Sequence, residues 1–70
     1  MKTCMVHDVE VKVGDNVAFN CGIEQWGKIV EIKRTHAGVA LVLENKHGFS
    51  GDRIGGDTIT TQLASECWAD

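Results

Sequence analysis

The chain has 70 residues, a net charge of −3 and an apolar content of 43%. Its length allows one domain, over residues 1–70, with a marginal core. Its acidic balance argues against tight, sequence-independent binding to nucleic acid, which depends on many lysine and arginine contacts with phosphate. The sequence shows neither the apolar core of a signal peptide nor a run long enough to span a bilayer, so we expect a cytoplasmic protein with no membrane partner.

Short runs rich in β-branched residues, separated by glycines, predict an all-β chain. In residues 7–13, Val9, Val11 and Val13 alternate with charged residues, and we expect the three valines on one buried face of a strand. The pattern leaves open whether residues 1–7 join the sheet.

The next run, residues 16–20, follows a Gly-Asp turn at residues 14–15. It places Val17 and Phe19 on one face of a second strand. Residues 23–26, with the sequence IEQW, are predicted to form the loop that leads to the strand after it.

Residues 28–34 and 39–44 predict an antiparallel hairpin, because the four residues that connect them end in a glycine. Val30 and Ile32 are expected together on the buried face of its first strand. The second strand is apolar on both faces, which predicts the most central strand of the sheet; its apolar residues are Val39, Ala40, Leu41, Val42 and Leu43.

Residues 45–57 contain four glycines and little periodicity, so they predict a long ordered loop. The pattern at the end of the chain allows two interpretations, a helical turn or a short strand. Residues 59–67 have helical spacing, and a threonine near their start could cap a single turn. Cys67 and Trp68 fit a last short strand equally well.

The stretches VKVGDNVAF, WGKIVEI and VALVLE, with Gly22 between the first two, follow a recurring order. They give a Gly-Asp turn, a short strand, a glycine-bearing loop and two apolar strands. Residues 11–44 thereby resemble the KOW and Tudor-like branch of SH3-like barrels. The resemblance implies a five-stranded barrel. Residues 45–57 would form its long glycine-rich loop, and the helical interpretation of residues 59–67 would add one short helical turn near the C-terminus. The later stretch ENKHGFSGD…GG…ECW is similar to small, uncharacterised single-domain proteins of phages and bacteria.

In SH3-like barrels the ligand surface tends to lie on the loops after the first strand and after the hairpin, which implies Trp26 and Phe49 as contact residues. Trp68 could return to the same rim. Tryptophan is large and amphipathic, as interface anchors are. The other reading is that Trp26 plugs the end of the barrel and Trp68 covers the core.

We therefore predict a non-catalytic protein-binding module, monomeric or weakly dimeric. It would be a small phage or bacterial accessory protein that docks on and modulates a cellular enzyme or complex. The expected partner-binding residues are Glu24, Gln25, Trp26, Phe49, Asp52 and Arg53.

An RNA-binding or ribonucleoprotein-binding module is the alternative that the KOW likeness implies. It would use Trp26 to stack on a base, with phosphate contacts from nearby cations. The candidate cations are Lys28, Lys33, Arg34 and Arg53.

A zinc-stapled interaction domain is the second alternative. Cys4 and His7 have the C-x-x-H spacing of a ligand pair, and the other candidates are Cys21, His36, His47 and Cys67. Because only one close pair exists, we expect no metal and no cofactor, with the cysteines as thiols that behave as small apolar side chains. No nucleophile signature surrounds any of the cysteines, so we expect no enzyme activity.

Overall fold

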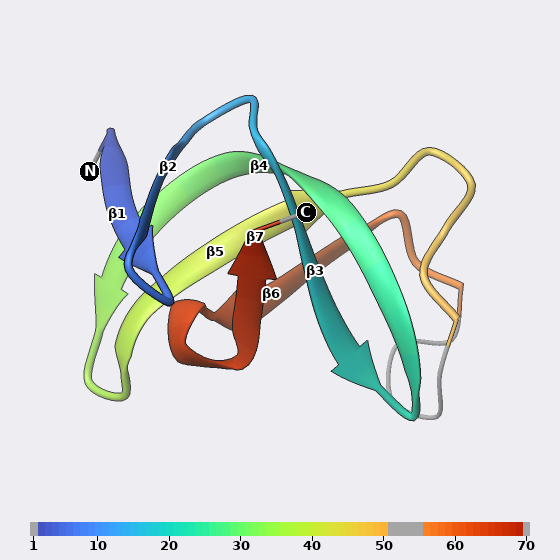
Figure 1. The fold of residues 1–70 in the computed structure, drawn as a ribbon. Helices are drawn as coiled ribbons and strands as arrows, with labels where there is room; N and C mark the ends of the chain where they lie inside the picture. The colour runs from blue at the N-terminus through green and yellow to red at the C-terminus, as the bar shows by residue number, and fades with distance from the viewer. Residues whose placement is uncertain (1, 51–55, 70) are drawn as a thin grey trace.

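The computed structural model describes residues 2–50 and 56–69, which are built from β-strands (Figure 1). β1 (Thr3–Val6) and β2 (Val9–Lys12) form a two-stranded antiparallel sheet. The other strands form a five-stranded antiparallel sheet in the order β6-β5-β4-β3-β7, and their bounds are β3 (Asn16–Cys21), β4 (Ile23–Thr35), β5 (Gly38–Glu44), β6 (Ile59–Leu63) and β7 (Cys67–Ala69). The prediction of an all-β chain is confirmed. The five-stranded sheet is not a closed barrel, because β6 and β7 remain its edges within the described residues.

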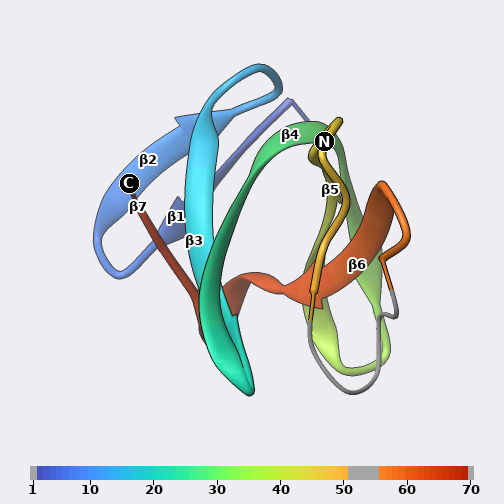
Figure 2. The same ribbon diagram turned by 90° about the vertical axis from the view of Figure 1, so that its right-hand side faces the viewer.

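The longest strand, β4, lies at the centre of the sheet and pairs with a different neighbour along each half. Its first half pairs with β3 as far as Lys28, and its second half pairs with β5 from Lys28 onward. The register shifts between Ile29 and Glu31, so Val30 forms a β-bulge, which bends a strand and increases its twist. Figure 2 shows the sheet folded over along β4, with β3 on one side and β5 and β6 on the other. The prediction that residues 39–44 form the most central strand is wrong, because these residues form β5, which lies next to the central strand β4.

The two layers of the folded sheet enclose one apolar core. The rings of Phe19 and Phe49 meet there at a centroid distance of 5.6 Å and an interplanar angle of 52°. Val6 and Val11 of the β1–β2 hairpin belong to the same buried cluster. Residues 3–6 therefore pair and pack with the rest of the chain. The largest fully buried side chains are Phe19, Phe49, Ile29, Leu41, Leu43, Val6, Val17 and Cys67.

Three valines that were expected to be buried are exposed. Val9 and Val13 are about half exposed, at 48% and 47%, and only Val11 of that run is buried. Val9 directly follows the β1–β2 turn and Val13 lies beyond the end of β2, so only the middle of the strand faces the core. Val30 is exposed because the bulge turns it outward and leaves Ile29 and Ile32 as the buried residues.

The predicted hairpin of residues 28–44 is confirmed as β4–β5, with Thr35 opposite Gly38 across its turn. The Thr35 hydroxyl accepts a hydrogen bond from the Ala37 N–H at 3.2 Å and donates one to the Gly38 carbonyl at 2.8 Å. The Gly-Asp turn at residues 14–15 is also confirmed. Its Asp15 carbonyl accepts the Ile29 N–H at 2.8 Å, which ties the turn to β4.

The end of the chain combines the two readings that the sequence left open. A 3-10 turn, η1 (Ala64–Glu66), joins β6 to β7. Thr60 and Thr61 lie in β6, and the residue that caps the turn is Leu63, which makes no side-chain capping bond. Among residues 2–50 and 56–69 there is no helix of the length and apolarity needed to cross a membrane.

Candidate functional site

Trp26 lies inside a strand and not in a loop. Gly22 alone joins β3 to β4, at a φ of 84° that favours glycine, and Ile23 already pairs with Cys21. The prediction that residues 23–26 form a loop is therefore wrong. Alternation along β4 turns Trp26 to the outer face of the sheet, where its side chain is 50% exposed.

Two tryptophans flank Ala18 on this outer face. Ala18 of β3 is the register partner of Trp26 on β4 and of Trp68 on β7. Register partners in an antiparallel sheet share a face, so the two indoles lie on either side of the small alanine. Ala18 is only 4% exposed although it points outward, as expected if the larger neighbours cover it. Trp68 is partly buried. We call these three residues the tryptophan row.

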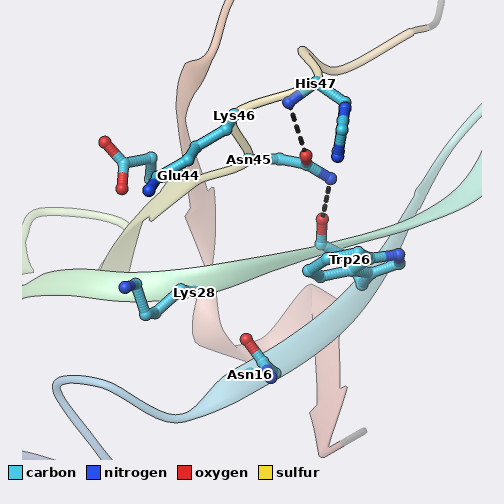
Figure 3. A pocket seen from close by; sticks show the side chains of 7 residues that line it. All are labelled: Asn16, Trp26, Lys28, Glu44, Asn45, Lys46 and His47. Carbon is cyan, nitrogen blue, oxygen red and sulfur yellow. Dashed lines mark hydrogen bonds between the residues drawn. The ribbon is translucent and has the colours of Figure 1, made fainter.

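A shallow pocket of about 260 Å³ lies beside Trp26 (Figure 3). The Asn45 side chain, which lines the pocket, makes two hydrogen bonds. Its Nδ2 donates to the Trp26 carbonyl at 3.1 Å, and its Oδ1 accepts the His47 N–H at 3.0 Å. Asn45 thereby ties the loop after β5 to the strand that carries the indole. The lining residues are Asn16, Trp26, Lys28, Glu44, Asn45, Lys46 and His47.

The pocket carries two lysines against one carboxylate. Lys28 and Lys46 line it together with Glu44, and Figure 3 shows these three side chains on the same side of the indole. Over the described ranges 2–50 and 56–69, the only ion pair joins Lys12 to Asp15. Neither lysine of the pocket is thus neutralised by a salt bridge there. The chain as a whole is acidic, so this is a local cationic surface on a negatively charged protein.

Two of the predicted contact residues lie inside the molecule. Gln25 is 8% exposed, because it alternates with Trp26 along β4, and its Oε1 accepts the Ser50 N–H at 2.7 Å. Its buried Nε2 has no hydrogen-bond partner in the part of the chain described. Phe49 is 1% exposed and packs on Phe19. Both residues hold the loop after β5 against the core, so neither lies on a surface rim as expected.

The remaining predicted contact residues have different outcomes. Glu24 is exposed and, two residues from Trp26 on β4, points to the same outer face. Asp52 and Arg53 lie outside the described residues.

Gly27 has a role that the sequence did not reveal. It sits within β4, and a β-carbon there would lie 2.9 Å from Cζ of Phe49 and 3.1 Å from Cβ of Leu43. Gly27 therefore provides the space for the Phe49 ring. Glycine typically marks a turn or the start of a strand, so the sequence did not indicate this packing role inside β4.

The cations of the nucleic-acid alternative do not gather around Trp26. Lys28 lines the pocket, whereas Lys33 lies five residues further along β4, roughly 16 Å away along the strand. Arg34 lies beside the β4–β5 turn and lines a separate depression with Thr35 and His36. Arg53 is outside the described residues.

The candidate zinc ligands do not converge within the described residues, which hold no group of three or more His, Cys, Asp or Glu side chains placed to bind a metal. The Cys67 thiol is fully buried and donates to the Leu63 carbonyl at 3.4 Å. Burial, followed by the charges of Glu66 and Cys4, raises the pKa of Cys67 to about 11. Burial also raises the pKa of Cys4. As protonated thiols, both cysteines behave as small apolar side chains.

The chain was also compared with known proteins. No protein-family model, curated protein or solved structure matches it. The residues around Trp26 therefore provide the basis for assigning a function.

Proposed function

We propose that this protein is a non-catalytic protein-binding module whose partner docks on the outer face of β3, β4 and β7, around Trp26. The observation that carries the proposal is a half-exposed indole held within a strand, in register with a second tryptophan across Ala18. Tryptophan is enriched among the residues that dominate binding energy at interfaces, because it combines a large apolar area with a polar N–H group.

Polar residues border the tryptophan row on both sides. Asn20 and Glu24 are register partners at one side, and Asn16 and Lys28 are register partners at the other. An apolar centre with a polar rim is the usual anatomy of a protein–protein interface. The resemblance to small phage and bacterial proteins supports an accessory protein that modulates a cellular enzyme or complex.

The finer description of the fold, an SH3-like barrel with an open seam, belongs to the same proposal. It is supported by the five-stranded antiparallel sheet, the fold along β4 and the 3-10 turn before the last strand. A scaffold of this kind serves many unrelated functions, so the function is argued from the outer face and not from the barrel.

The test is affinity capture with the full chain and two variants, Trp26→Ala and Met5→Ala. Met5 is the matched control, since its side chain is 57% exposed and lies on the separate β1–β2 hairpin. Thermal melting verifies that both variants are folded. We expect Trp26→Ala to lose proteins that the wild type and Met5→Ala retain. Retention of the same proteins by Trp26→Ala would show that the outer face is not the binding surface.

RNA binding is the second candidate, because Lys28 and Lys46 lie beside an exposed indole. Stacking of a base on Trp26 with phosphate contacts to these lysines would give an affinity for oligouridine that falls steeply as salt rises. A partner affinity that is flat over the same salt range excludes this candidate.

A further inference from the structure

We infer that the partner presents an acidic segment in which a carboxylate lies next to an apolar side chain. The apolar side chain packs beside the indole of Trp26, and the carboxylate pairs with Lys28 and Lys46. This inference depends on the proposed function and specifies the chemistry of the partner at the same site.

The charge of the pocket favours an anionic partner. Lys28 and Lys46 are exposed and flank the pocket, and no described residue forms an ion pair with them. Complementary charges at the edge of an interface accelerate association and select the correct partner. Glu44, the register partner of Lys28, supplies one carboxylate for the two lysines, so a carboxylate of the partner would supply the second.

The size of the pocket favours a single side chain over a cofactor. Small-molecule sites usually enclose about 300–1,000 Å³, whereas this pocket measures about 260 Å³ and opens on the surface of the sheet. It suits one apolar side chain of a macromolecule, packed beside the indole of Trp26.

The charges along β4 also determine the orientation of the bound partner segment. Glu24 lies two residues before Trp26 and Lys28 two residues after it, and all three point outward. The acidic end of the partner segment is therefore placed over Lys28 and away from Glu24. A single carboxylate avoids Glu24 in this placement, whereas a continuous nucleic-acid backbone would bring further phosphates over Glu24.

A displayed library of random short peptides, selected on the wild-type protein and counter-selected on Trp26→Ala, tests the inference and requires no identified partner. We expect the enriched peptides to carry Asp or Glu next to Leu, Ile, Phe or Trp. Their affinity, measured by fluorescence anisotropy, is expected to fall roughly tenfold in Lys28→Glu and in Lys46→Glu. Lys33→Glu is the matched control, because it makes the same charge change on β4 far from the pocket, and it should leave the affinity unchanged.

Each other outcome overturns the inference. The enriched peptides could depend on Trp26 but be neutral or basic, or bind equally well to Lys28→Glu and Lys46→Glu. Either result would support the binding surface and show that the acidic chemistry assigned to the partner is wrong. If no peptide depends on Trp26, the acidic segment is wrong, and the capture experiment with Trp26→Ala decides separately whether the surface binds a protein. If oligouridine binds and requires Trp26 and Lys28 while no acidic peptide is selected, the partner is a nucleic acid.

Discussion

Gly27 illustrates how one residue without a side chain supports the interior of the molecule. A β-carbon at this position would press on Phe49 and Leu43. Because overpacking a filled core forces its side chains to shift, we expect Gly27→Ala to lower the free energy of unfolding by about 1–3 kcal/mol. The measurement is urea denaturation of the single variants and of the double variant with Phe49→Leu. The smaller leucine should relieve part of the penalty, so strictly additive effects would contradict this account of Gly27.

The Asp15 carboxylate makes the stability of the fold depend on pH. Its carboxylate accepts hydrogen bonds from the Lys12 backbone N–H at 3.0 Å and from the Lys12 ammonium at 3.1 Å. These bonds, the backbone one foremost, hold the pKa of Asp15 below its usual 3.8. Since the pKa is lower in the folded state, the stabilisation is complete above the unfolded pKa and is lost as pH falls through the folded pKa.

The variant Asp15→Asn isolates this charge, because its amide oxygen can still accept the backbone N–H. Compared with the wild type, it should lower the urea midpoint at pH values well above 3.8 and have a smaller effect well below the folded pKa. An effect of the same size at both pH values would show that the charge of Asp15 does not stabilise the fold.

Among the elements, the β1–β2 hairpin is held by an unusual turn. His7 and Asp8 have φ values of 49° and 68°, as both central residues of a type I′ turn do, although this turn type favours Asn-Gly. Replacing them by His7→Asn and Asp8→Gly should raise the free energy of unfolding by about 1 kcal/mol, because these residues adopt positive φ with less strain. Urea denaturation measures the change, and a lower midpoint for the double variant would contradict the turn assignment.

The same turn explains why the sequence did not predict β1. Its two residues carry none of the glycine or asparagine signals of a hairpin, so nothing marked residues 3–6 as the partner of residues 9–12. The β4–β5 hairpin, in contrast, was predictable from two strand-like runs and a glycine at the end of their connection. The bulge at Val30 was not predictable, because it arises where β4 changes partners from β3 to β5.

The candidate site depends on strands that are far apart in the sequence. The amphipathic character of tryptophan made Trp26 a predicted contact residue. Its position in a strand could not be predicted, because it depends on the one-residue turn at Gly22. The tryptophan row requires the register of β7, β3 and β4 together, which no local pattern contains. Phe49 and Gln25 were assigned to the surface because their burial depends on the path of the loop after β5, which Asn45 and Ser50 fasten to β4.

The most direct test of the central claim, that a partner docks on the outer face around Trp26, is photo-crosslinking in the cells that produce the protein. A photoreactive benzoylphenylalanine is introduced at Trp26, or at Met5 or His36 as exposed control positions on the β1–β2 hairpin and at the β4–β5 turn. We predict a discrete crosslinked protein from position 26 and none from the other two. Crosslinks that form at Met5 or His36 and not at Trp26 would contradict the claim.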